Sequence, residues 1–228
     1  MLNRLRSLLN GELPARPHPD HPGWPGKVGD VLLADGGLVT VRPLKVGDFS
    51  SWRRMRLEDE HLIRPVEPTV RGSWAEAHTR ASFMEQLAGL RRLASFGHVL
   101  PLAIEVDGLF AGQLTIGGIE RGTALSGWVG YWVSSRYTGR GVAQAALALG
   151  VDHAFNKVGL HRLTATFLPD NPTSGSVLKA VGFRREGYLR GNLHIDGRWR
   201  DHEFVALLRE DYPETAIRRL QQRGTLRH

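Results

Sequence analysis

The segment that most constrains the fold of this chain is residues 127–155, whose pattern is that of a strand, a glycine-containing turn and a helix. Residues 128–133 are mainly aromatic or β-branched, which is typical of a strand, and an alanine- and leucine-rich run that predicts a helix begins at Val142. Gly139 and Gly141 lie between them. A helix start has backbone N–H groups without partners and carries the positive end of the helix dipole, and glycine lets an anion approach the backbone. The junction is therefore a predicted diphosphate site.

Two common nucleotide-binding motifs do not fit this junction. A P-loop has Lys-Ser/Thr after its second glycine, but Val142 and Ala143 follow Gly141 here. A dinucleotide fingerprint has a third glycine at position 144, where this chain has Gln144.

The pattern that remains is Arg136-x-x-Gly139-x-Gly141, which resembles the R/Q-x-x-G-x-G/A signature with which the GNAT superfamily of N-acetyltransferases holds the pyrophosphate of coenzyme A. A second block, Asn171-Pro-Thr-Ser174 followed by residues 177–183, is similar to the N-x-x-S…L-x-x-x-G-F segment of the same superfamily. The similarity is greatest to the branch of ribosomal-protein alanine N-acetyltransferases (RimJ- and RimL-like). It covers about residues 36–212 and implies an α/β (α+β) GNAT fold: a mixed, mostly antiparallel central sheet with one splayed parallel strand pair, flanked by helices.

Apolar runs and turn residues predict the elements of this fold. The expected strands are 31–34, 38–44, 99–106, 109–116, 125–133, 162–167, 189–195 and 198–208. The expected helices begin at Asp48, which we interpret as an N-cap, at Ser73, which opens a capping box and a helix running to about Leu93, at Val142, and after Asn171. Because a helix separates strands 125–133 and 162–167, these two strands should be parallel.

Composition divides the 228 residues into three parts. Residues 1–30 are a proline-rich arm, residues 31–212 the acetyltransferase domain, and residues 213–228 a basic C-terminal helix or tail.

Several classes of protein are disfavoured by the same composition. The absence of cysteine excludes disulfides, thiolate metal sites and a cysteine nucleophile, and His18 and His21 in the arm lack further ligands, so we predict no metal. No apolar run approaches the ~20 residues of a membrane span, and no secretory signal is visible, so a cytoplasmic protein is expected. The formal charge of +7 favours an anionic partner such as coenzyme A, but acidic residues are interspersed with the basic ones, so no specific nucleic-acid partner is predicted.

The resemblance implies attack of an amine on the thioester of acetyl-coenzyme A. A backbone N–H near Val133 would stabilise the negative charge on the thioester oxygen, and Ser174 matches the serine that can hydrogen-bond the departing sulfur. As alternatives, Gly139 and Gly141 also suit a plain tight turn, and Asn171 and Ser174 a helix start. The residues expected to contact the cofactor are Val133, Ser134, Arg136, Gly139, Arg140, Gly141, Val142, Ala143, Asn171 and Ser174.

The general base is not identified by the sequence. Many N-terminal acetyltransferases of this superfamily have a glutamate on the strand before the glycines, but Trp128 occupies that position here. Tyr131, His194, Glu105 and Asp201 are the alternatives, acting directly or through water. An α-amine has a pKa of about 7.7–8.0 and a lysine about 10.4, a difference of ~3.5 kcal/mol in the free energy of deprotonation, so a weak base suffices for an α-amine.

Three functions stay open at this point. The preferred one is acetylation of a protein N-terminus, such as that of a ribosomal protein; the others are acetylation of a small-molecule or antibiotic amine, and a non-catalytic acyl-coenzyme A sensor or ribosome-associated module. Substrate selection is expected in segment 56–72, where Glu58, Asp59, Glu60 and Glu67 either meet a cationic amine or form a solvated helix end. Homodimers occur in the branch, so a monomer and a homodimer are both open.

Overall fold

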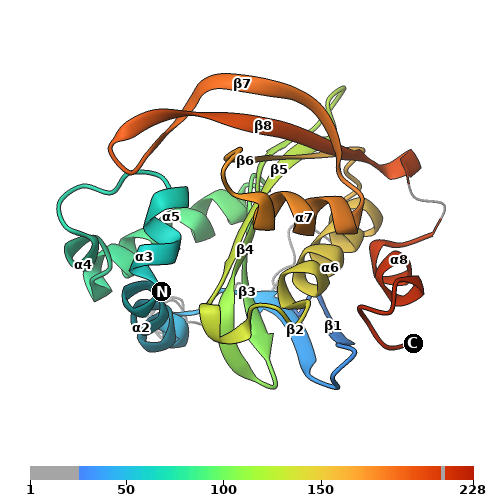
Figure 1. The fold of residues 1–228 in the computed structure, drawn as a ribbon, viewed down its shortest axis with the longest axis horizontal. Coiled ribbons are helices and arrows are strands. Elements are labelled where there is room, and N and C mark those ends of the chain that lie inside the picture. The colour runs from blue at the N-terminus through green and yellow to red at the C-terminus, as the bar shows by residue number, and fades with distance from the viewer. Residues whose placement is uncertain (1–25, 212–213) are drawn as a thin grey trace, which may run out of the picture.

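One eight-stranded sheet organises the chain, which a computed structural model describes over residues 26–211 and 214–228 (Figure 1). The strand order is β1-β2-β3-β4-β5-β6-β8-β7. The strands are β1 (Gly29–Leu32), β2 (Leu38–Pro43), β3 (Leu100–Val106), β4 (Leu109–Glu120), β5 (Ser126–Val133), β6 (Arg162–Phe167), β7 (Arg184–Ile195) and β8 (Arg198–Leu208). All neighbours are antiparallel except β5 and β6, which confirms the predicted mixed sheet.

Helices cover the sheet in two groups. Figure 1 shows α2 to α5 on one side of strands β3 and β4, and α6 to α8 on the other. The α-helices are α2 (Phe49–Glu58), α3 (Glu60–Ile63), α4 (Trp74–Ala77), α5 (Arg80–Ser95), α6 (Val142–Asn156), α7 (Pro172–Val181) and α8 (Ala216–Gln222). The short 3₁₀ helices are η1 (Val46–Asp48), η2 (Arg64–Val66), η3 (Ser135–Tyr137) and η4 (Arg209–Asp211).

Each group of helices closes one apolar cluster against the sheet. On β3, Leu102 and Ile104 belong to the cluster with α6, whereas Ala103 between them belongs to the cluster with α2 and α5, as expected from the alternation of side chains along a strand. Helix α6 is buried almost all round because the sheet, α7 and α8 surround it. Gly150 permits this close approach, since a Cβ there would lie 2.6 Å from Leu114 Cδ2.

Two details of the first helical group differ from the sequence prediction. Ser73 does form a capping box with Glu76, but the helix it opens ends at Ala77, and Thr79 caps a second helix, α5. The break arises where the His78 ring turns inward and bonds the Trp74 carbonyl. Asp48 precedes α2 as predicted, yet its carboxylate makes no capping bond.

The carboxylate of Asp48 instead accepts two hydrogen bonds from the Arg42 guanidinium, at 2.7 and 2.8 Å, and one from the Lys45 N–H. Asp48 therefore stands at the predicted N-cap position, but its carboxylate is bonded to Arg42 and Lys45 and not to the first N–H groups of α2.

The chain beyond residue 213 is a helix followed by a return to the sheet. The N–H groups of Ala216 and Ile217 donate to Asp152 of α6, which anchors the start of α8. Residues 223–228 then run beside β1, where Leu226 forms a bridge with Leu33 and is 3% exposed. The predicted proline-rich arm up to residue 25, with His18 and His21, lies outside the described residues.

No helix within residues 26–211 and 214–228 has the length and apolar character needed to cross a membrane.

His153 makes the stability of the fold depend on pH. It lies 7% exposed in α6, its Nε2 has no partner among the described residues, and burial, with a smaller effect of Lys157, lowers its pKa to about 4. Below pH 6.5 His153 binds a proton in the unfolded chain but stays neutral in the folded chain. The free energy of unfolding therefore falls as pH falls toward 4. Between pH 6.5 and 5 this site alone removes about 2 kcal/mol.

We therefore expect the loss of stability between pH 7 and pH 5, measured by urea denaturation, to be about 2 kcal/mol smaller in His153→Leu than in the unsubstituted protein. Equal losses in the two proteins would show that His153 is not the titrating group.

Candidate functional site

The parallel strands β5 and β6 stay paired over only three residue pairs. The pairs are Ser126 with Arg162, Gly127 with Leu163, and Trp128 with Thr164. Beyond Trp128, β5 remains paired with β4 through Val133, and β6 remains paired with β8, but β5 and β6 no longer pair with each other. This open edge, which we call the strand fork, confirms the predicted splay. Its unpaired backbone groups suit an extended, amide-containing ligand.

One hydrogen bond shows which way the backbone N–H groups at the end of β5 point. Ser134 N–H donates to Ala111 O near the start of β4, 2.8 Å away. Because backbone groups alternate along a strand, the N–H of Val133 points to the other edge, into the strand fork.

The loop from residue 134 to 141, which we call the glycine loop, joins β5 to α6. Gly139 and Gly141 have φ values of +78° and +85°, in the left-handed region that favours glycine. Within the described part of the chain, the N–H groups of residues 139–141 donate to no acceptor, and the first bond of α6 runs from Ala145 N to Gly141 O. The N–H groups of Val142 and Ala143 in the first turn have no acceptor within the helix. Together they form an anion-binding helix start.

The two arginines of the glycine loop are engaged elsewhere. Arg136 donates to both carboxylate oxygens of Glu58, at 2.9 and 3.0 Å, and Arg140 donates to Asp35 at 2.7 Å. The positive potential at the helix start therefore comes from the backbone first. The C-terminal segment also borders this loop, since a Cβ on Gly141 would lie 3.0 Å from Thr225 Cγ2. No local sequence signal pointed to that contact.

Ser174 and Tyr131 meet across the strand fork. Asn171 caps α7 by accepting from Ser174 N–H at 3.2 Å, with Pro172 next to it as predicted. The Tyr131 hydroxyl of β5 lies 3.3 Å from both Ser174 Oγ and Ser174 O. Burial raises the pKa of Tyr131 to about 12, against a smaller opposite effect of Ser174, so the phenol stays protonated at neutral pH. Tyr131 is therefore a hydrogen-bond donor, and a poor base.

The other candidate bases lie in separate networks. His194 Nδ1 pairs with Thr69 Oγ1 at 2.9 Å, near the tip of the β7–β8 hairpin. Glu105 accepts from Arg42, and Asp201 accepts from Tyr188 and from Gly191 N–H. The structure thus brings together Tyr131 and Ser174 but not His194.

Trp128 stands where the paired part of β5 ends. Its side chain is 48% exposed, and its indole lies over Gly117 and Gly118 of β4, where added Cβ atoms would come within 2.4 and 2.7 Å of the ring. Only glycines allow this placement. An aromatic face therefore occupies this point of the fork.

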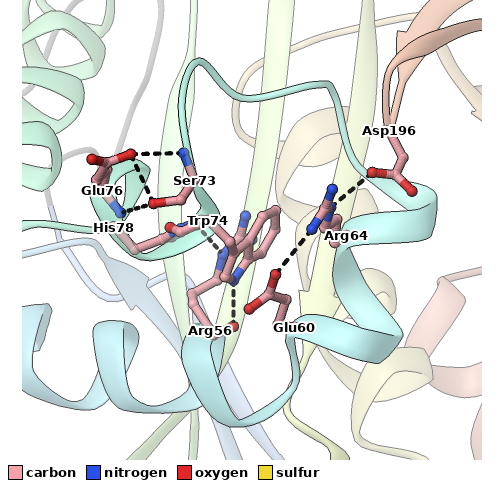
Figure 2. A network of polar contacts seen from close by, with 8 residues as sticks. All are labelled: Arg56, Glu60, Arg64, Ser73, Trp74, Glu76, His78 and Asp196. Carbon is pink, nitrogen blue, oxygen red and sulfur yellow. Dashed lines mark hydrogen bonds and ion pairs between the residues drawn. The ribbon is translucent and has the colours of Figure 1, made fainter.

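A buried arginine, Arg56, which the sequence analysis did not single out, links the two ends of segment 56–72. Arg56 is 6% exposed, pairs with both oxygens of Glu67 at 2.9 Å, and donates to His78 Nε2 at 3.0 Å. Its guanidinium lies 5.0–5.8 Å from the ring centres of Trp52, Trp74 and Trp132, at cation–π distance. Figure 2 shows the Trp74 indole N–H donating to the Arg56 carbonyl, at 2.7 Å.

Two cavities lie where segment 56–72 meets the β7–β8 hairpin, which arches across the top of the view in Figure 1. The smaller, about 220 Å³, contains Trp74, Thr69 and Gly197 in its wall. The larger, about 370 Å³, is lined by Glu58, Glu60, His61 and Asp196 among others.

Arg64 lines both cavities and links Glu60 to Asp196 through ion pairs of 3.2 and 2.8 Å (Figure 2). The acidic residues singled out in segment 56–72 thus all have partners: Glu58 with Arg136, Asp59 with Ser135, Glu60 with Arg64, and Glu67 with Arg56.

Among residues 26–211 and 214–228, no three histidine, aspartate or glutamate side chains gather as a metal site would require.

Comparison with known proteins agrees with this geometry. Residues 39–184 match the family described as acetyltransferase (GNAT) domain. The chain is 36% identical over 186 residues to the probable N-acetyltransferase YjcK of Bacillus subtilis, covering 78% of this chain and 98% of the relative. It is 31% identical over 199 residues to the [ribosomal protein uS5]-alanine N-acetyltransferase of Escherichia coli, covering 83% and 97%. It is similar to the solved structure of Mycobacterium smegmatis RimJ in complex with CoA-disulfide, with 46% identity, a TM-score of 0.87, and coverage of 90% and 98%.

Proposed function

The chain belongs to the acetyltransferase (GNAT) family as a RimJ-like N-acetyltransferase, and from this premise we propose that its acceptor is the α-amino group at a protein N-terminus, such as that of a ribosomal protein. Enzymes of this family use acetyl-coenzyme A. The relative from Escherichia coli is described as acting on an alanine of a ribosomal protein, and this supports the proposal.

The observation that carries the cofactor assignment is the strand fork beside an unpartnered helix start. An arm rich in amides can pair with the free backbone edge of β5 as a further strand would, and a diphosphate can accept hydrogen bonds from N–H groups of residues 139–143. Both features follow one another along residues 129–143, in the order that pantetheine and diphosphate follow one another in coenzyme A.

In the proposed mechanism, the acceptor nitrogen attacks the thioester carbonyl as its proton passes to water. The N–H of Val133 stabilises the negative charge that develops on the carbonyl oxygen. When the C–S bond breaks, the hydroxyl of Ser174 donates to the departing sulfur. Tyr131, kept neutral by burial, donates to the Ser174 carbonyl, and its oxygen also lies 3.3 Å from Ser174 Oγ, so the phenol holds this serine in place.

The nature of the acceptor follows from what stands at Trp128. An aromatic ring cannot remove a proton, so the acceptor must reach its neutral form with little help. An α-amine does so about 2.5 pKa units more readily than a lysine. The carboxylates that line the larger cavity, Glu58, Glu60 and Asp196, are already paired with arginines, so the preference for an α-amine rests on the missing base and not on this lining.

A panel of short peptides tests the acceptor. With acetyl-coenzyme A, we expect thiol release with free N-termini, alanine first among them, and none with peptides that are blocked at the N-terminus but carry internal lysines. Release only with blocked lysine peptides, or only with antibiotic amines, would contradict the proposal.

A matched pair of glycine variants tests the cofactor site. Gly139 and Gly159 have φ values of +78° and +76°, and a Cβ at either meets nothing within 4 Å, but they flank opposite ends of α6. We expect Gly139→Glu to weaken coenzyme A binding, measured by calorimetry, at least about tenfold through repulsion of the diphosphate. Gly159→Glu carries the same charge and backbone strain and should bind normally. Equal affinities in the two variants would refute the site.

Ser174→Ala tests the assignment of the hydrogen-bond donor to sulfur. We expect kcat to fall about 10²-fold while coenzyme A affinity is unchanged, since the hydrogen bond strengthens only as the thiolate leaves. Ser176→Ala, an exposed serine on the same helix, serves as the control in initial-rate kinetics. Wild-type turnover in Ser174→Ala would remove this residue from the mechanism.

A further inference from the structure

Two adjacent carboxylates at the end of α2 hold the glycine loop, although they lie 76 or more residues away in the sequence. Asp59 accepts from Ser135 N–H at 2.9 Å and from the Ser135 hydroxyl at 2.6 Å. Glu58 accepts from Arg136 with both oxygens. Asp59 is only 4% exposed, whereas the Glu58 and Arg136 side chains are largely solvated, so Asp59 makes the stronger link.

The charge of Asp59 runs against the anion site next to it. Burial would raise the pKa of Asp59, but the hydrogen bonds from Ser135, together with smaller effects of Ser134 and His61, lower it below the ordinary value, so the group is ionised at neutral pH. A buried negative charge beside a diphosphate site disfavours the anion by Coulomb repulsion. The carboxylate of Asp59 therefore does not attract the cofactor. Its effect is on the geometry of the glycine loop.

Asp59 binds the part of the glycine loop that directly follows Val133, whose N–H is assigned to the thioester oxygen. Ser134 is bonded to β4 and Ser135 to Asp59, so the chain is fixed on both sides directly after Val133. The N–H of Ser135 donates to Asp59, and farther along the loop the N–H groups of Arg136 and of residues 139–141 have no acceptor among the described residues. The contact thus fixes the backbone between the N–H of Val133 and the free N–H groups farther along the loop.

The same turn of α2 also holds segment 56–72. Arg56, three residues before Asp59, binds Glu67 near the far end of that segment, and its carbonyl accepts from the Trp74 indole (Figure 2). A continuous series of contacts therefore runs from Glu67 through Arg56 and the last turn of α2 to Asp59 and Ser135. It joins the walls of the two cavities to the glycine loop.

We propose that Asp59 is a positioning residue that couples segment 56–72 to the glycine loop, so that acceptor and coenzyme A each strengthen the binding of the other. The inference rests on the proposed function, because it assigns the acceptor to one end of this series of contacts and the cofactor to the other. Linkage requires that the factor be the same in both directions.

Asp59→Asn and Ser135→Ala test the coupling, with Asp48→Asn as the matched control. Asp48 is also 4% exposed, also adjoins α2 and also accepts from a backbone N–H, that of Lys45. Its side-chain donor is Arg42 where that of Asp59 is the Ser135 hydroxyl, and it has no hydrogen bond to the glycine loop. By calorimetry we expect Asp59→Asn and Ser135→Ala each to weaken coenzyme A binding about tenfold, and the double variant to be no weaker than the worse single one. Asp48→Asn should lower thermal stability and leave the affinity unchanged.

The second measurement is the dissociation constant of an alanine-initiated peptide with and without coenzyme A. We expect coenzyme A to tighten peptide binding in the unsubstituted protein and in Asp48→Asn, and the ratio to approach one in Asp59→Asn. If Asp59→Asn does not fold, Ser135→Ala, which removes one hydroxyl, decides the question.

Normal coenzyme A affinity and normal coupling in the Asp59 and Ser135 variants would overturn the inference, and equal losses in all three variants would overturn it too, as an effect of stability alone. The proposed cofactor site would still stand after either result if Gly139→Glu weakened coenzyme A binding. Normal binding in Gly139→Glu would refute the cofactor site itself.

Discussion

The separation of β5 from β6 after Trp128 is the constraint on which the rest of the site depends. Two parallel strands that stay paired leave no room and no free backbone groups, whereas here the edge of β5 from residue 129 to 133 is open. Each strand keeps its other neighbour, β4 or β8, so the opening does not unravel the sheet. The crossover helix α6 then places its free N–H groups at the end of the same edge. One local loss of pairing thus creates a continuous surface of hydrogen-bond donors and acceptors.

In the proposed mechanism, the residues around this opening divide the chemistry between backbone and side chains. The backbone N–H groups of Val133 and of residues 139–143 stabilise the negative charges of the thioester oxygen and the diphosphate. The Ser174 hydroxyl donates to the departing sulfur, and the Tyr131 hydroxyl lies in contact with this serine. Burial keeps the phenol protonated, so Tyr131 does not act as a base. Trp128 stands where the resemblance implies a carboxylate, so in this proposal the acceptor must lose its proton without a protein base. A low-pKa α-amine meets that demand more easily than a lysine does.

Much of this arrangement was predictable because its signals are local. The strands and the parallel pair were predicted from aromatic and β-branched runs and glycine turns, and α7 from its Asn171-Pro172 start. The motif resemblance predicted the splay. The contacts that couple the parts were not predictable, since Asp59 with Ser135, Arg56 with Glu67, and Leu226 with Leu33 join residues without any periodic pattern. The break at His78 also depends on a tertiary contact, with Arg56, and this overrides the helical pattern around it.

The central claim is that the strand fork and the glycine loop form one binding surface for coenzyme A. A crystal structure of this chain with coenzyme A tests it most directly. The account predicts the pantetheine arm between β5 and β6, with its amides bonded to the free edge of residues 129–133, and diphosphate oxygens within hydrogen-bond distance of N–H groups in residues 139–143. A cofactor bound elsewhere, or a fork that closes with β5 and β6 paired beyond Trp128, would contradict it.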